Sequence, residues 1–431
     1  MKSHPHPRSL HRALACVSRY SNPRPGLLLL GLVAGALSAR AQNVLTAPPP
    51  VNTTPPALQE FRATESGEAP SGESPGLSMV RLPLQWGPVT LRPHFLYSLS
   101  YADGILASPG DPESTIINQF SPGVTFVIGS HWTLDYTPSL QWYSNNKFQN
   151  NVGQNVALNG WAAYEDWTLG LSQTYSEFNA PTVQTGSQTE QESFATGLTA
   201  SYRFNSKVSM DLALSQDFQS AQQLESYNQW STMDYVNYQF WPRFNAGLGL
   251  GGGYVSVNTG SDITFEQLQG RIAWSATDKS SLVIHGGLEY RQFLSGGVSP
   301  MLNPVFGLAL QTQLAKKTSL SLSADQGLSA SYFENQTSES TGVSLTLAQK
   351  LSGKLGLTLG GSYGTVTYTS SATGVAPLGN YDYASFTTRL TYAIISRGTI
   401  SVTYQLSDNV SSAPGLSFTA NQVGLELGYS F

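Results

Sequence analysis

The chain has few charged residues. They make up 11% of its 431 residues, against roughly 25% in an ordinary soluble domain. Intrinsic disorder does not explain this, because 40% of the chain is hydrophobic and 11% is aromatic. A formal net charge of −5 and the lack of a Lys/Arg-rich stretch argue against nucleic-acid binding. The longest apolar run, residues 26–37, is also too short for the roughly 18 residues that a membrane-spanning helix needs.

The amino terminus predicts a secretory signal peptide over residues 1–41. Residues 1–25 contain five basic residues and no acidic one, and the apolar run and the small-residue site Ala39-Arg40-Ala41 follow. The single cysteine, Cys16, precedes the apolar run, which argues against a lipoprotein anchor. Cleavage after Ala41 leaves 16 basic and 27 acidic residues, a net charge of −11, and no cysteine. An exported chain without disulfides favours a large fold closed by backbone hydrogen bonds.

Residues 42–86 predict a flexible periplasmic extension. This segment is rich in Pro, Gly and Glu, with proline runs at 48–50 and 55–56, and it cannot bury a core. Two further roles stay open: a peptide that docks a periplasmic partner, and a segment that folds back into a pore.

From residue 87 to residue 431 the sequence repeats a two-part unit. Eight short polar pivots have alternating, strand-like sequence on both sides: 130–131, 165–166, 205–207, 242–243, 277–279, 316–317, 352–354 and 396–397. Longer polar segments, including 102–115, 180–191 and 370–380, read as loops on the opposite rim. Eight turns between nine pairs of strands predict an all-β fold, a transmembrane antiparallel up-and-down β-barrel of about 18 strands.

Alternation along the strands and the placement of aromatic residues support the barrel. In residues 208–218 and 399–406 apolar side chains occupy almost every second position, as a lipid-facing strand requires. Aromatic residues gather near the expected turns and near the expected loops, which predicts two interfacial belts. The turn belt comprises Trp132, Trp167, Phe204, Trp241, Phe244 and Trp274, and the loop belt comprises Tyr101, Tyr175, Phe178, Tyr254, Tyr332 and Tyr368.

The carboxy terminus carries the most specific motif. Val423, Leu425, Leu427, Tyr429 and Phe431 form an alternating apolar series that ends on a terminal Phe, and it resembles the β-signal of outer-membrane proteins. With the repeated strands, as in residues 131–140 and 166–175, the chain resembles Gram-negative outer-membrane β-barrels of the porin type. The resemblance implies an outer-membrane location, contact with lipid and lipopolysaccharide, folding by the barrel assembly machinery, and small polar solutes as cargo. It leaves self-association open.

The same alternation predicts which side chains line the channel. The inward set comprises Arg92, His94, Arg203, Arg271, Glu289, Arg291, Arg389 and Glu426, with His285, Asp135, Asp211, Asp217 and Asp325 on the same face. These charges either filter solutes electrostatically or pair with each other and select nothing. The glycine-rich strand at residues 244–258 is expected to contain a bulge.

Catalysis is not expected. The mature chain has only three histidines, His94, His131 and His285, and none belongs to a local Ser/His/Asp group or to a metal-ligand pattern. We therefore predict no catalytic residue, no metal site and no cofactor. Passive diffusion of small polar solutes or ions is the favoured function. The alternatives are an export conduit for polysaccharide and a structural or adhesive barrel without transport.

Overall fold

The structure of the protein, a computed structural model, describes residues 84–430 except 223 and 296. The predicted signal peptide, residues 42–83 of the predicted extension, and Phe431 lie outside the described residues. No helix in the described residues is long and apolar enough to cross a membrane. The strands are β1 (Gln85–Trp86), β2 (Val89–Ser108), β3 (Asp111–Ile128), β4 (Trp132–Tyr136), β5 (Ser139–Tyr143), β6 (Asn151–Tyr164), β7 (Trp167–Pro181), β8 (Gln188–Arg203), β9 (Val208–Ala221), β10 (Tyr227–Trp241), β11 (Phe244–Val257), β12 (Ile263–Thr277), β13 (Ser280–Phe293), β14 (Met301–Ala315), β15 (Thr318–Ala330), β16 (Gln336–Lys350), β17 (Leu355–Ser370), β18 (Asn380–Ile395), β19 (Gly398–Ser411) and β20 (Phe418–Ser430).

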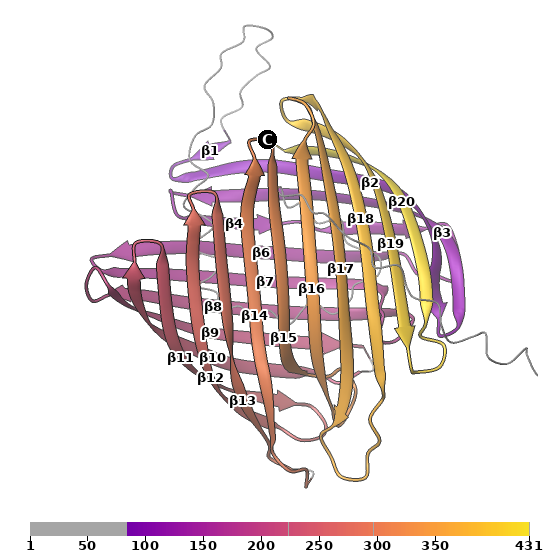
Figure 1. Ribbon diagram of the computed structural model, residues 1–431. Helices are drawn as coiled ribbons and strands as arrows, with labels where there is room; N and C mark the ends of the chain where they lie inside the picture. The colour runs from indigo at the N-terminus through magenta and orange to yellow at the C-terminus, as the bar shows by residue number, and fades with distance from the viewer. Residues whose placement is uncertain (1–83, 223, 296, 431) are drawn as a thin grey trace, which may run out of the picture. The chain divides into compact units, whose positions relative to one another are not determined.

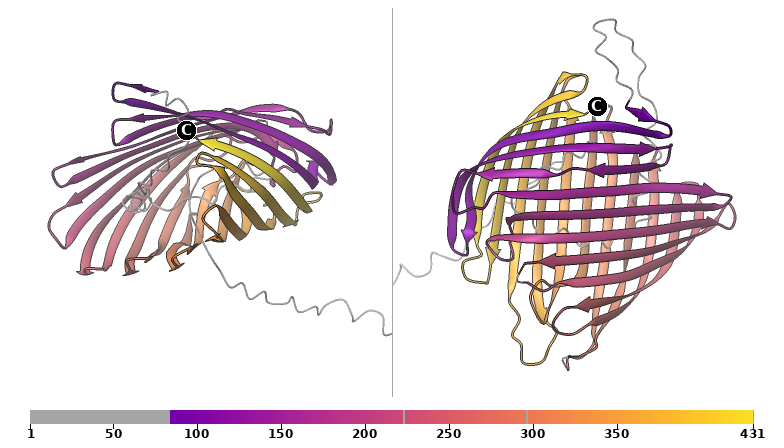
Figure 2. Two further views of the ribbon diagram at one scale, coloured as in Figure 1. Left: turned by 90° about the horizontal axis from the view of Figure 1, so that it is seen from above. Right: turned by 180° about the vertical axis from the view of Figure 1, so that it is seen from behind.

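These strands form one closed antiparallel barrel. Each strand from β6 to β20 pairs with its chain neighbours, and β20 closes the ring by pairing with β2 from His94–Ser430 to Asp103–Asn421. The closure is visible in Figure 2, where the yellow strand β20 lies beside the indigo strand β2.

The wall contains 18 strands, as the sequence predicts. The short strand β1 pairs only with the start of β2 and adds nothing to the wall. β4 and β5 are two parts of one wall strand, because both lie between β3 and β6 and only Thr137 and Pro138 separate them. Proline has no N–H to donate to a neighbouring strand, so the ladder is interrupted there.

The two faces of the wall differ in polarity. Outward positions are apolar and strongly exposed, for example Leu248 at 73% and Val402 at 51%. Inward positions on the same strands carry Ser, Thr, Gln, Asn and charged residues, and many of them are buried. Successive side chains of a strand point to opposite faces, so this alternation places the apolar set outside.

All eight predicted turns join neighbouring strands at one end of the barrel, called the turn end here. The predicted loops lie at the other end, the loop end, but two of them are shorter than expected. In the segment 102–115 only Pro109 and Gly110 lie outside strands, and in 180–191 only residues 182–187 do. The strands continue through these polar segments, with a register irregularity between Ala102 and Ile105. Polarity alone was therefore a poor guide to strand ends.

The predicted aromatic belts are only partly correct. Tyr101 and Tyr254 are exposed on the outer face, and so are Trp241 and Trp274 near the turns. Tyr368, in contrast, is 8% exposed and packs in an apolar cluster inside the barrel. It lies five positions from the outward Tyr363, and an odd spacing puts it on the opposite face. Tyr332, in the β15–β16 connection, also points inward, because its hydroxyl donates to Gln219 of β9.

Candidate functional site

The inner faces of β9 to β13 hold the densest group of charged and amide side chains. The Arg271 guanidinium donates to the Asp211 carboxylate and, at 2.7 Å, to the Asn237 side-chain oxygen. It also lies over the ring of Tyr235, 4.1 Å from the centroid, and the Tyr235 hydroxyl donates to Gln269 at 2.8 Å. A guanidinium held by a carboxylate, an amide and an aromatic face has a fixed position. These residues form a rigid polar patch on the wall.

Glycines on β11 make this patch possible. Gly247, Gly249, Gly251 and Gly253 face inward, and a Cβ on Gly247 or Gly249 would meet the side chains of Asn237 or Tyr235. Because β11 has no inward side chains at these four positions, side chains from β10 and β12 meet across it.

The expected bulge in residues 244–258 is wrong. β11 pairs with β12 without a register shift from Phe244–Trp274 to Val255–Ile263, and its only irregular pairing, with β10, is at the turn between Gln239 and Trp241.

A second buried pair lies nearer the loop end. The Arg291 Nε donates to Glu289 at 2.7 Å, and both side chains are almost fully buried. The Gln267 amide donates to the other carboxylate oxygen of Glu289 at 2.6 Å. Arg291 also donates through Nη2 to the Leu328 backbone carbonyl at 3.0 Å. Arg291 is therefore held by its neighbours and is not open to solvent.

The remaining predicted lining residues are placed on the inner face nearer the turn end. Arg389 donates to Glu426 at 3.0 Å, and the His94 Nε2 lies 3.0 Å from the Thr137 hydroxyl and 3.8 Å from Asp135. Arg92 and Arg203 are exposed. Within residues 84–430, no carboxylate lies within ion-pair distance of either arginine. Six of the eight predicted lining residues thus contact a side chain of opposite charge or a hydrogen-bond partner. Arg92 and Arg203 have no carboxylate partner in the described residues.

The inner faces of β15 to β18 differ from this charged patch. Ser323 and Ser344 are opposite each other and their hydroxyls lie 2.7 Å apart. Ser362 and Ser385 repeat the arrangement on β17 and β18, also at 2.7 Å. Around these serines this part of the wall presents hydroxyl groups that both donate and accept, and its inward charges include Asp325 and Arg389. The inner face is therefore asymmetric: the buried ion pairs of Arg271 and Arg291 lie on β9 to β13, and serine pairs predominate on β15 to β18, where Arg389 has the remaining arginine ion pair of the inner face in the described residues.

The predicted assembly residues lie at the closing seam. Val423, Leu425 and Leu427 are exposed on the outer face of β20. The Tyr429 ring stacks on Phe95 of β2, with centroids 5.9 Å apart. Their role in assembly remains a prediction, and Phe431 is outside the described residues.

Sequence reasoning did not identify Tyr235, Asn237, Gln267 or Gln269 as partners in the charged patch. All four lie on the inward parity of their strands, but polar residues at inward positions are too common to single out. The glycines at every second position of β11 were the available signal, because they indicate a face without side chains. Among the residues that the structure describes, no group of three or more His, Cys, Asp or Glu side chains is placed to hold a metal ion.

The chain is similar to solved structures only at low sequence identity and low TM-score. No protein-family model matches the chain, and no curated protein matches it. Among solved structures, Pseudomonas aeruginosa OccK2 (OpdF) in complex with glucuronate is similar at a TM-score of 0.44 and 11% identity, over 79% of this chain and 98% of that one. Pseudomonas aeruginosa OpdO is similar at 0.42 and 13%, over 79% and 97%. The siderophore receptor PirA from Pseudomonas aeruginosa is similar at 0.37 and 9%, over 79% and 80%. The fold is established by the chain's own strand pairing, and these scores add nothing about its function.

Proposed function

We propose that the protein is a porin-like channel of the bacterial outer membrane that lets small polar solutes or ions diffuse passively. The observation that carries this proposal is the polarity of the wall: a closed 18-strand barrel is apolar outside and hydroxyl-rich and charged inside. A barrel of about eight strands is filled by its own side chains, whereas 16 to 18 strands leave room for an aqueous path. Lipid around the barrel would match the apolar outer face, and water inside it would hydrate the polar inner face.

The pairing of the lining charges favours weak selectivity. Arg271, Arg291 and Arg389 each contact a carboxylate, so their fields largely cancel a few ångströms away. Arg92 and Arg203, the two predicted lining arginines without a carboxylate partner in the described residues, lie at the turn end and favour anions there. Uncharged hydroxylated solutes suit the serine-rich wall of β15 to β18.

The test is liposome swelling with the purified, folded protein. We expect uncharged sugars and small polar solutes to enter at rates that fall with solute size, with heat-modifiable migration on a gel as proof of folding. Arg92→Gln/Arg203→Gln should lower the preference for anions over cations and leave the entry of uncharged sugars unchanged. The comparison is made at low salt, because at 0.1 M salt screens charges beyond about 10 Å. A folded protein that admits no solute under any condition would favour an export conduit or a structural barrel.

A further inference from the structure

The loop-end tip of the β15–β16 hairpin, residues 327–337 and called the flap here, is separated from β14, while on its other side Gln336 and Thr337 stay paired with Ser370 and Thr369 of β17. In the described residues the ladder between β14 and β15 extends toward the loop end only to Phe306 opposite Gln326. β15 and β16 stay paired with each other as far as Ala330 opposite Thr337. In continued register Pro304 would face Leu328, and proline offers no N–H to that edge. The flap is therefore free of the wall on its β14 side.

The flap packs against the inside of the barrel. Even-numbered residues of β15 belong to the outer face, as Gln326 does opposite the exposed Phe306. Leu328 and Ala330 have the same parity, yet both are buried. Ala330 shares a buried cluster with Ile263 and other inward residues of β10 to β12. A residue of outer parity reaches the inner face of β12 only if the flap folds into the barrel.

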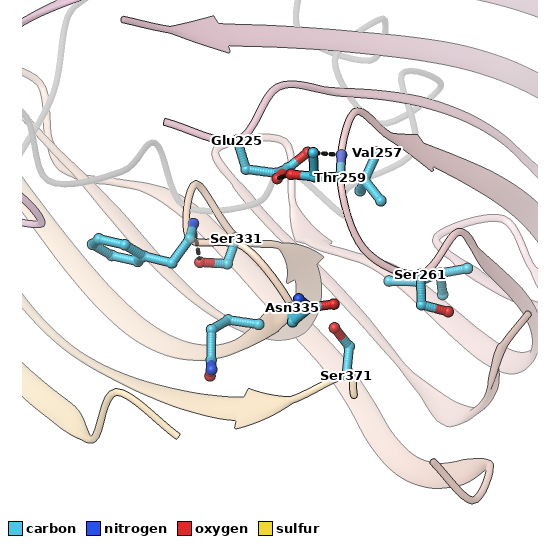
Figure 3. Close-up of a pocket in the computed structure, with 10 residues that line it drawn as sticks. Glu225, Val257, Thr259, Ser261, Ser331, Asn335 and Ser371 are labelled. Atoms are coloured by element: carbon cyan, nitrogen blue, oxygen red, sulfur yellow. Dashed lines mark hydrogen bonds between the residues drawn. The ribbon is translucent and has the colours of Figure 1, made fainter. Parts of the chain in front are cut away.

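The tip of the flap makes contacts on both sides of the mouth. The Tyr332 carbonyl accepts from the Glu225 N–H at 2.7 Å, and the Tyr332 hydroxyl donates to Gln219 of β9. The Phe333 ring contacts Tyr368 of β17 edge-on, with centroids 5.6 Å apart. Figure 3 shows this region, where Ser331 and Asn335 of the flap face Glu225, Thr259 and Ser371 from other loop-end segments. The flap thus bridges connections that lie well apart around the ring.

The flap joins a buried apolar layer at the loop end. Phe333 packs against an inner cluster drawn from β2, β3, β5, β17, β18, β20 and two loops. Its members are Ala102, Ile105, Leu106, Ile117, Tyr143, Phe148, Val183, Val366, Tyr368, Tyr381, Tyr383, Phe418 and Ala420. Apolar side chains buried against each other exclude water from this part of the inner face.

One side chain fastens the base of the flap. Arg291 of β13 is 1% exposed and donates through Nη2 to the Leu328 carbonyl at 3.0 Å, while Glu289 holds its Nε. A buried, charge-assisted hydrogen bond to a strand edge that lacks a wall partner is strong. Arg291 therefore acts on the flap and not on passing solutes.

The inward position of the flap leaves polar atoms without partners. Arg291 Nη1, Gln336 Oε1, Thr337 Oγ1 and Ser340 Oγ are buried and make no hydrogen bond. Buried unsatisfied polar groups cost free energy that hydration returns. Outward movement of the flap would hydrate them, which offsets part of the cost of breaking the flap's other contacts.

We propose that the flap is a gate at the loop-end mouth, and that the bond from Arg291 to Leu328 is the latch that keeps it closed. The gate rests on the proposed channel function and adds its regulation. Opening swings residues 327–335 toward β14 while Gln336 and Thr337 stay paired with β17, breaks the contacts of Tyr332 and Phe333, and connects the polar lumen to the outside.

The first arm of the test removes the latch. Arg291→Met/Glu289→Met takes away both charges, so no unpaired carboxylate remains in the barrel. In planar-bilayer recordings we expect its open probability to rise about tenfold or more over wild type, the factor that corresponds to one lost charge-assisted hydrogen bond. Open probability is the readout of the latch, and unit conductance is recorded separately because Arg291 and Glu289 also lie on the inner face. Heat-modifiability on a gel shows that the variant has folded.

The second arm locks the gate. The only cysteine, Cys16, falls in the predicted signal peptide, so Gln219→Cys/Tyr332→Cys can be bridged in the mature chain with a reducible bifunctional thiol reagent. We expect bridging to abolish openings and reduction to restore them. Ser329→Cys/Ser338→Cys is the matched control, because these residues face each other across the β15–β16 hairpin at the base of the flap, with hydroxyls 2.9 Å apart. Bridging them should leave gating unchanged.

The outcomes separate the gate from the channel. Steady wild-type conductance that neither the latch variant nor the Gln219–Tyr332 bridge alters overturns the gate and leaves the proposed channel standing. Silence of every folded form, the latch variant included, overturns the channel and the gate with it. Latch-dependent opening together with reversible locking supports both.

Discussion

Replacing Val402 with arginine is expected to destabilise the folded barrel by about 2–4 kcal/mol, the cost of an arginine on the lipid face near the bilayer midplane. Val402 is 51% exposed on the outer face of β19, and its register partners are Leu390 and Leu425. A guanidinium there lies in hydrocarbon with no polar neighbour. Reversible urea unfolding in lipid vesicles, followed by tryptophan fluorescence, measures the loss.

The matched control lies three residues further along the same strand. Gln405 has inward parity and its register partners are Thr387 and Gln422, so an arginine there meets polar side chains and solvent. We expect Gln405→Arg to change the free energy of unfolding by less than about 1 kcal/mol. Equal losses at the two positions would contradict a lipid-facing outer wall, and a larger loss at Gln405 would reverse the assignment of the faces.

Arg271→Met is expected to cost about 3–5 kcal/mol, the usual penalty for leaving one partner of a buried ion pair unpaired. The Arg271 side chain is 7% exposed and Asp211 is 18% exposed, so little solvent reaches the carboxylate that remains. The substitution also removes the guanidinium from the Tyr235 ring and from Asn237. The same vesicle unfolding experiment measures this loss.

A double-mutant cycle distinguishes pairing from packing. Arg271→Met/Asp211→Leu removes both charges and should recover most of the loss, because no unpaired charge stays buried. Arg389→Met should be costly as well, because the carboxylate it leaves unpaired, Glu426, is only 5% exposed. Additive losses in the cycle, with no recovery in the double variant, would show that Arg271 acts only by filling space.

The fold was predictable because the barrel follows from periodicity. Two-residue alternation and eight short turns specify strand number and faces, and Pro138 interrupts a wall strand without changing the count. The loop end was harder to predict. Residues 102–115 are polar, yet they remain in the ladder except at Pro109 and Gly110, because backbone pairing continues beyond the apolar band. Composition distinguishes segments in the apolar band from segments in water, but it does not show where the hydrogen-bonded strand ladder ends.

The inward face of these side chains was predictable, but their contacts were not. Parity alone places Arg271 and Arg291 on neighbouring inward strands, but not the pairing of Arg271 with Asp211 three strands away across the glycines of β11. The flap was not predictable, because its β15 residues keep the alternation of a wall strand. Only the early end of the β14 ladder and the burial of Leu328 and Ala330 reveal it.

The most direct test of a lipid-facing outside and a water-facing inside is a single-cysteine scan of β19 in lipid vesicles. Each of residues 399, 400, 402, 403, 404 and 405 is replaced by cysteine in the mature chain and labelled with one fluorophore. Brominated lipid should quench the label at 400, 402 and 404, and aqueous iodide should quench it at 399, 403 and 405. Quenching without a two-residue period, or with the two sets exchanged, would contradict a transmembrane barrel with a polar path through it.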